Sequence, residues 1–390
     1  MGLKAWATSN DYVLTAPSGA VVTALVDSDN PLAIRPFTVR FEFGDSSYDP
    51  TNETWVSGSF WTQVSSSPNV WDFTYQNTNW NTGNYTSVLS SRFADRSNLT
   101  NVLGANLAGV VNASNLFLGC TALYEVHNVD LSSTTNANKI FGGCEAVTVF
   151  DGINLQSAET LVSTFDSCSN FTSFNNLIVS QPKDFSKTFY RCYNLTTAPA
   201  MDTSHATSMS KMFESCYALT SVPLYSTSLV TDMSYMFANC TSIQSLPTFD
   251  TSSVVSFNNM LYGCRSLAAV PAFNTTSGSA FSGMLMGCNT ITAVPLFDTR
   301  HATSFNYFCR DCTSLETIPL LSTVNVSSCE TMFVNCYNVE SGALALYTQM
   351  ANQVVPPADH ADTFKNCGSN TTTGQAELSQ IPTSWGGTMA

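Results

Sequence analysis

The chain has 390 residues, only 11% of them charged, and its formal net charge is −14. It contains 14 Lys and Arg residues, too few to form the clustered positive charge that nucleic acids and anionic membranes require. No stretch approaches the roughly 18 consecutive apolar residues of a membrane-spanning helix, so no membrane insertion is expected. The length predicts either several domains or one repeat array.

Residues 1–85 have the pattern of β structure. Three runs of β-branched and aromatic residues, at 12–16, 20–26 and 36–43, are separated by turn-forming segments at 17–19 and 27–31. In the third run, Phe37, Val39, Phe41 and Phe43 alternate with Thr, Arg and Glu, which predicts one buried and one solvent-exposed face. We therefore expect a small antiparallel sheet or sandwich that anchors or caps the rest of the chain.

The aromatic and amide-rich segment 71–80 precedes the repeats. We interpret it as a lid over the first coil, because the open end of a solenoid is an unpaired sheet edge. The first coil is predicted one period before the first repeat cysteine. There, Phe93 and Leu99 keep core positions and Arg96 replaces the cysteine.

From about residue 86 onward the sequence repeats every 24 residues. The marker is a cysteine ladder without a change of register: Cys120, Cys144, Cys168, Cys192, Cys216, Cys240, Cys264, Cys288, Cys312 and Cys336. Such a period is typical of a solenoid in which each coil buries its apolar side against its neighbours.

Each repeat combines two periodicities. Met209, Met212, Phe213 and Cys216 fall at i, i+3, i+4 and i+7, which predicts a short amphipathic helix. A β-branched segment that ends in proline follows and predicts one short strand per coil. Proline cannot donate to a ladder, so the strand should stop at that residue in each coil: Pro199, Pro223, Pro247, Pro271, Pro295 and Pro319. Asp-Thr-Ser after it predicts a turn closed by side-chain hydrogen bonds.

The predicted fold class is thus an α/β repeat, a solenoid with a short strand and a short helix per coil, preceded by a small all-β domain. The domains expected are an N-terminal β domain at 1–85, a solenoid of about 11 to 12 coils at 86–367, and a cap or tail at 368–390. After Cys336 a longer helix is predicted at 344–355, before a last half-coil at 364–367.

The repeat Ser-Met-Ser-x-Met-Phe-x-x-Cys-x-x-Leu-x-x-Val-Pro-x-Phe-Asp-Thr-Ser resembles the bacterial surface-protein type of leucine-rich repeat, the BspA-like family. The resemblance spans about residues 90–367 and is to the 24-residue form found in surface lipoproteins of mycoplasmas. It implies a right-handed solenoid with a role in adhesion, and similar repeats occur in structural and host-attachment proteins of bacteriophages. The chain shows neither a secretory signal nor a lipobox cysteine, which favours a virion component.

The cysteines are interpreted as small buried hydrophobic residues, because structural zinc needs converging pairs and these thiols lie in single file. Disulfides between rungs remain geometrically open. Cys309 and Cys312 have the redox spacing Cys-x-x-Cys, but Cys309 occupies a core position. Cys329 lies one coil further on, so a Cys309–Cys329 disulfide is a second alternative.

No catalytic, cofactor-binding or metal site is predicted, and no cofactor. His205 and His301 lie in turns about 19 Å apart at strand spacing, too far to share a metal. Asp202, Asp250 and Asp298 lie on alternate coils, about 10 Å apart. That distance leaves a solenoid glycan hydrolase as a low-ranked alternative, although a structural turn explains these carboxylates better.

Function is expected in the variable positions beside the strand, because solenoids present them as one surface. The candidate binding face is Thr220, Ser221, Ser245, Arg265, Glu316 and Thr317. We expect a non-enzymatic structural and adhesion protein on a phage virion surface, as a fibre or decoration protein. The alternative is an adhesin on a bacterial cell surface. The N-terminal domain would contact other virion or surface proteins, and the solenoid a host protein or glycan. A homo-oligomer is left open.

Overall fold

The computed structural model describes residues 6–8, 11–15, 21–25, 37–52, 59–75, 91 and 93–389. The chain divides into two compact units, residues 1–182 and 183–390. Residue 85, where the sequence suggested a domain boundary, lies outside the described residues. The predicted turns at 17–19 and 27–31 lie outside the described residues.

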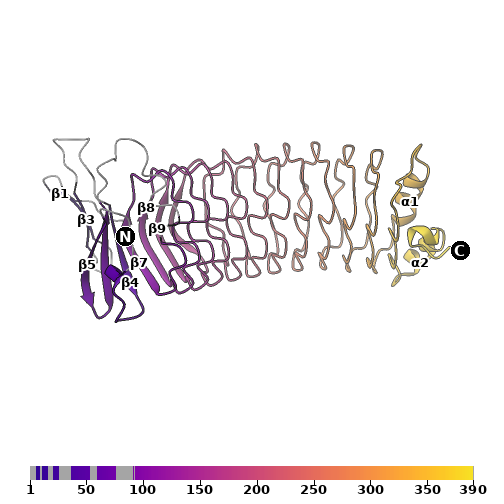
Figure 1. Ribbon diagram of the computed structural model, residues 1–390. Coiled ribbons are helices and arrows are strands. Elements are labelled where there is room, and N and C mark those ends of the chain that lie inside the picture. Colours follow the sequence, from indigo (N-terminus) through magenta and orange to yellow (C-terminus); the bar gives the residue numbers. More distant parts are fainter. Residues whose placement is uncertain are drawn as a thin grey trace. The chain divides into compact units, whose positions relative to one another are not determined.

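The first unit contains two sheets (Figure 1). The smaller is antiparallel, in the order β1 (Trp6–Thr8), β2 (Asp11–Thr15) and β3 (Val21–Leu25). The larger has seven strands in the order β10-β9-β8-β7-β4-β6-β5. Its antiparallel part is β4 (Phe37–Phe43), β5 (Ser59–Ser66) and β6 (Asn69–Tyr75), and a 3-10 turn, η1 (Pro50–Asn52), follows β4. The three predicted N-terminal strands are therefore confirmed.

The strand β4 has the predicted alternation. Val39, Phe41 and Phe43 are buried, while Arg40 on the opposite face pairs with Asp72 of β6 at 2.7 Å. The Phe41 ring lies edge-on to Phe93, 4.8 Å away. One apolar face of β4 thus joins the core of the first coil.

The predicted lid is wrong in its position. Residues 71–75 belong to β6, which pairs with β4 and β5, and 76–80 lie outside the described residues. The strand that covers the edge of the first coil is β4, which pairs antiparallel with β7. A strand is the more effective cover because its backbone groups satisfy those of the exposed edge directly.

The solenoid begins with a parallel sheet of β7 (Leu99–Asn106), β8 (Glu125–Asp130), β9 (Val149–Leu155) and β10 (Phe174–Val179). Successive strands pair at a 24-residue offset, as at Val102 with Val126 and Val126 with Phe150. The sheet covers about three turns of a β-solenoid. Phe93 and Leu99 are buried, which confirms that the repeat begins before the first cysteine.

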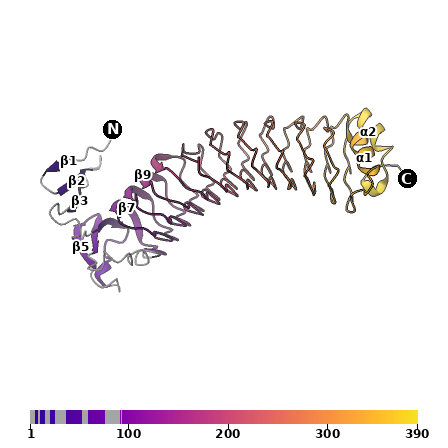
Figure 2. The same cartoon turned by 90° about the horizontal axis from the view of Figure 1, so that it is seen from above.

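The second unit continues the 24-residue coils without regular strands (Figures 1 and 2). The predicted strand is reduced to single bridges five residues after the cysteine, such as Thr197 with Ser221 and Thr317 with Ser341. The cause is the proline two residues later, Pro199 and Pro319 in these coils, which cannot donate to the next rung. The strands β8, β9 and β10 carry His127, Asp151 and Asn175 at that place.

The predicted short helix is absent from the described coils. At Met209–Cys216, alternate N–H groups bond the next coil, as Phe213 N–H does to the Met236 carbonyl. The others close turns within the coil, as Met212 N–H does to the Met209 carbonyl. Lys211 and Ser215 have positive φ, and a left-handed residue every four positions prevents a continuous helix. The apolar stripe still points inward, because a chain of turns repeats at nearly the helical spacing.

The C-terminal end is helical. The helix α1 (Ala343–Ala351) confirms the helix predicted from residue 344. It displaces the last coil, so that Ser328 bridges Asp359 at an offset of 31 instead of 24 residues. The helix α2 (Thr372–Leu378) and the 3-10 turn η4 (Thr383–Trp385) follow, and Trp385 is buried. Among the described residues no helix is long and apolar enough to cross a membrane.

Candidate functional site

The six residues of the predicted binding face are all exposed. Thr220, Ser221 and Ser245 lie on two adjacent coils, since Ser245 is 24 residues after Ser221. Thr317 occupies the same place three coils beyond Ser245, about 14 Å away at strand spacing. Arg265 directly follows its cysteine and belongs to a different edge of the coil. The structure therefore brings three of the six together and separates the others.

Some residues of this face form hydrogen bonds between neighbouring coils. The Thr220 hydroxyl donates to the Thr196 carbonyl at 3.0 Å, and Ser221 and Thr317 take part in the bridges between coils. The Glu316 N–H donates to the Thr292 carbonyl. The Thr220 hydroxyl is therefore used between coils, whereas Ser221, Glu316 and Thr317 are joined to the neighbouring coil through their backbone.

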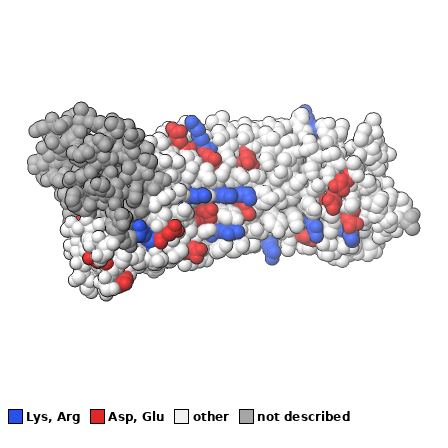
Figure 3. All heavy atoms as spheres, viewed as in Figure 1, with Lys and Arg blue, Asp and Glu red and all other residues white. Residues whose placement is uncertain are grey.

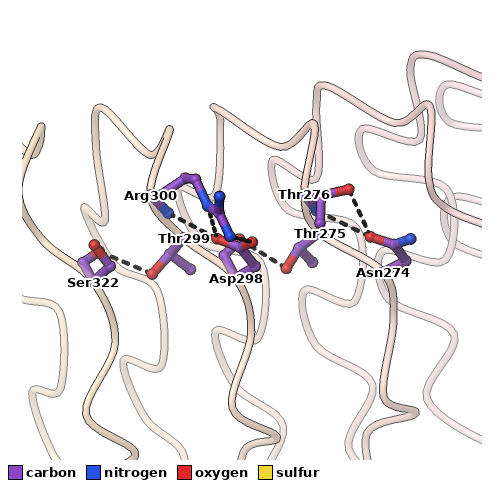
Figure 4. A network of polar contacts seen from close by, with 7 residues as sticks. All are labelled: Asn274, Thr275, Thr276, Asp298, Thr299, Arg300 and Ser322. Carbon is purple, nitrogen blue, oxygen red and sulfur yellow. Dashed lines mark hydrogen bonds and ion pairs between the residues drawn. The ribbon is translucent and has the colours of Figure 1, made fainter.

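The recurring carboxylates close turns, as predicted. Asp202 accepts from the Ser204 N–H at 2.9 Å, Asp250 from Ser252 at 3.1 Å, and Asp298 from Arg300 at 3.3 Å. Figure 4 shows this turn at Asp298, where the Arg300 guanidinium also folds back onto the carboxylate, and at Asn274 in the preceding coil.

These turns lower the carboxyl pKa values. The pKa of Asp202 is lowered mainly by the Ser204 N–H, that of Asp250 mainly by the Ser252 hydroxyl, and that of Asp298 mainly by the Arg300 side chain. A glycosidase acid needs a raised pKa so that it keeps its proton near neutral pH. The direction of these shifts is the opposite of what the general acid of a glycan hydrolase requires.

The threonine after each turn carboxylate is a buried structural residue. Thr251 is fully buried, and its hydroxyl donates to the Asn274 carbonyl of the next coil at 2.8 Å. The same bond recurs at Thr203, Thr227, Thr275 and Thr299. This column of hydroxyls bridges successive coils along the second unit.

We expect Thr251→Val to lower the free energy of unfolding by about 1 to 2 kcal/mol, because valine keeps the shape and removes the donor. Urea denaturation monitored by circular dichroism measures it. The control is Thr248→Val on the surface of the same coil, which should change stability by less than about 0.5 kcal/mol. Equal effects of the two substitutions would contradict the bridging role.

The histidines do not form a common site. His205 and His301 are exposed in their turns, as predicted. His127 contacts Glu125 at 3.2 Å on the outer face of β8, and His360 stacks on Trp385 at 4.1 Å. No group of three His, Cys, Asp or Glu side chains suited to a metal occurs in the part of the chain that the structure describes.

The cysteine ladder is buried, and its thiols are free. The Sγ atoms of nine ladder cysteines donate to a carbonyl 27 residues earlier, such as Cys216 to Phe189 at 3.1 Å and Cys240 to Phe213 at 3.2 Å. Cys309 and Cys329 are also free, so the alternative disulfide does not form. Burial raises the pKa of the Cys309 thiol, which opposes the thiolate that redox chemistry at Cys-x-x-Cys needs.

The structure also shows a second surface, which the sequence pattern did not predict. At the start of the second unit, the turn segments of three coils carry basic and aromatic side chains, which contact one another in three separate groups. We call this set the basic-aromatic patch; its members are Lys187, Tyr190, Arg191, Tyr193, Lys211, Tyr217 and Tyr235. Lys211 Nζ lies 4.5 Å from the Tyr235 ring centre, and the Arg191 guanidinium lies 4.9 Å from that of Tyr190. The available signal was the presence of four of the 14 Lys and Arg residues within residues 183–211.

A comparison with known families finds one match. The family described as "Mycoplasma protein of unknown function, DUF285" matches residues 68–150, 153–271, 183–294 and 231–346. These segments together cover more than half of the chain and coincide with most of the repeats. No curated protein and no solved structure matches.

Proposed function

Because the chain belongs to the DUF285 family of Mycoplasma proteins and forms a β-solenoid of 24-residue coils, we propose that it is a non-enzymatic attachment protein exposed on a biological surface. Its repeats are proposed to be of the right-handed, BspA-like leucine-rich type. The resemblance of the repeat motif to that class supports this assignment.

The main support for the proposal is that structural positions and variable positions are separated within each coil. The apolar stripe, the thiols and the turn threonines face inward or bridge coils, while the positions between them vary freely from coil to coil. Such a scaffold suits recognition over an extended surface rather than chemistry at one point. The lowered pKa values of the turn carboxylates further support a non-enzymatic role.

The proposed location is the surface of a bacteriophage particle, where the N-terminal strands contact neighbouring virion proteins and the solenoid contacts the host. A second candidate is an adhesin on a bacterial cell. The family description favours this second location, because it names Mycoplasma proteins.

Immunogold labelling with antibodies against the full chain tests the proposal on intact, unpermeabilised cells that carry the gene and on any particles they release. Label on particles supports the virion location, and label on the cell surface supports the adhesin. Label that appears only after permeabilisation would refute surface exposure altogether.

The enzymatic alternative has a separate test. Purified chain incubated with cell-envelope glycans is expected to release no reducing sugar. Release that disappears in Asp250→Asn, while the fold is retained by circular dichroism, would replace attachment with hydrolysis as the function.

A further inference from the structure

Several basic residues of this acidic chain lie close together in the sequence. Of the 14 Lys and Arg residues, four lie between residues 183 and 211: Lys183, Lys187, Arg191 and Lys211. Figure 3 shows a face that is mostly uncharged, with a row of blue atoms near its middle, red atoms beside that row and further blue atoms elsewhere. In a chain with a formal net charge of −14, a local excess of positive charge selects an anionic partner.

The cations of the patch are held by aromatic rings. Lys187 and Arg191 lie over Tyr190, at 5.8 and 4.9 Å from the ring centre, and Lys211 lies over Tyr235 at 4.5 Å. Lys211 also contacts Glu214 at 3.5 Å, with 36% of the lysine side chain exposed. These contacts restrict the long side chains, so less entropy is lost when they bind a ligand.

Two exposed tyrosines extend the patch. The Tyr193 and Tyr217 rings of adjacent coils stack at 5.1 Å with an interplanar angle of 7°, and they are 37% and 45% exposed. Only the buried Cys192 separates Tyr193 from Arg191 in the chain. The patch therefore combines cationic donors with amphipathic aromatic groups over neighbouring coils.

We propose that the basic-aromatic patch binds an acidic oligosaccharide, a short run of sugars that carry carboxylate or sulfate groups. Lys187 and Lys211 occupy equivalent positions on adjacent coils, about 4.8 Å apart along the solenoid. That spacing is comparable to the advance of one sugar along a pyranose chain, so neighbouring cations meet neighbouring acidic sugars. The tyrosines supply hydroxyl donors and apolar edges for the neutral parts of the sugars.

The patch suits a short acidic glycan better than a nucleic acid. A nucleic acid presents a long and dense row of phosphates that needs many cations, whereas this patch has few and the rest of the chain is acidic. The inference deepens the proposed attachment function, on which its biological meaning rests. The binding of sugars is measured with purified protein, so its outcome does not depend on where the protein is located.

Isothermal titration of the full chain tests the proposal with four probes. They are an oligogalacturonate, the same oligosaccharide with its carboxyl groups reduced to alcohols, a heparin-derived oligosaccharide, and a single-stranded oligonucleotide of equal charge. Binding of a carboxylated or sulfated probe that weakens with added salt is expected, with no binding of the reduced sugar. The two acidic probes distinguish carboxylate from sulfate recognition.

The patch variant is Lys187→Asn/Arg191→Asn. Both residues have positive φ, which asparagine tolerates, and the pair of Lys211 with Glu214 stays intact. We expect about tenfold weaker binding of the acidic sugar, with an unchanged unfolding midpoint. The charge-matched control is Lys139→Asn/Lys365→Gln, which should bind as the parent does. Tyr217→Ser should weaken binding, whereas Tyr337→Ser, at the same place of a distant coil, should not.

Three results would overturn the proposal. The first is equal binding of the acidic and reduced sugars, or of neither. The second is the same loss in the control variant as in the patch variant, which would mean diffuse charge rather than a site. The third is tighter binding of the oligonucleotide than of any sugar, which would assign the patch to nucleic acid.

Discussion

Raising the pH from 8 to 10.5 in reducing buffer is expected to lower the free energy of unfolding steeply. Burial raises the pKa of four of the ladder thiols, to about 12 at Cys120 and well above the ordinary value at Cys240, Cys264 and Cys288. Cys329, outside the ladder, is raised to about 11. Unfolded thiols titrate near pH 8.5 to 9, so above that pH the unfolded chain releases protons that the folded chain keeps.

The difference between the folded and unfolded pKa of each thiol sets the sign and size of the change in stability. The contribution of each thiol is fully present below about pH 8.5 and is lost as the pH rises toward its folded pKa. Between those limits each thiol weakens folding by about 1.4 kcal/mol per pH unit. Because several buried thiols lie in any group of coils that unfolds together, the combined loss reaches several kcal/mol by pH 10.5.

Urea denaturation at a series of pH values, with a phosphine reductant present, measures this slope. The variant Cys240→Ala/Cys264→Ala removes two thiols and should flatten the slope by about 2.7 kcal/mol per pH unit. A stability that is constant from pH 8 to 10.5, or a slope that the double variant leaves unchanged, would contradict a ladder of buried neutral thiols.

Phe237→Ala is expected to lower the free energy of unfolding by about 3 to 5 kcal/mol. Phe237 is fully buried and stacks on Phe213 at 5.8 Å and on Phe249 at 6.1 Å. Truncation leaves a cavity between coils that the neighbouring rings cannot fill, since each is held in register by its own coil. Urea or thermal denaturation of the full chain measures the change.

The matched control is Leu296→Ala, which also truncates a large apolar side chain on the solenoid. Leu296 is 74% exposed, so its removal should change stability by less than about 0.5 kcal/mol. If Phe237→Ala cost no more than this control, the stacked phenylalanines would not be the source of cohesion between coils.

The candidate site was only partly predictable. The six residues of the predicted face were chosen as variable positions beside the strand, and all are exposed. Their mutual positions depend on which edge of the coil each residue occupies, and Arg265 lies on a different edge from Ser245. The basic-aromatic patch was missed because Lys187 and Tyr235 lie in a segment expected to be a helix. The contact between Lys211 and Tyr235 joins adjacent coils, so it appears only once the coils are stacked.

The sequence by itself determined the repeat, its period and its interior. Spacing alone placed Cys216, Phe213 and Met212 on the inside, because inward-facing residues must recur at equal intervals in any stack of equal coils. Composition also predicted the turn chemistry at Asp250 and the helix that begins near Leu344.

Only the tertiary structure decided how the backbone satisfies its hydrogen bonds. The apolar stripe fits a helix and a chain of turns equally well, and the choice depends on carbonyls of the next coil, which accept from alternate N–H groups. The residue before each cysteine adopts positive φ and is often glycine or asparagine, as at Gly263 and Asn239. This preference is the local sequence feature that indicates turns instead of a helix. In the same way, pairing of β4 with β7 closed the first coil. Pairing between distant segments is a property of the assembled sheet, and no periodic sequence pattern predicts it.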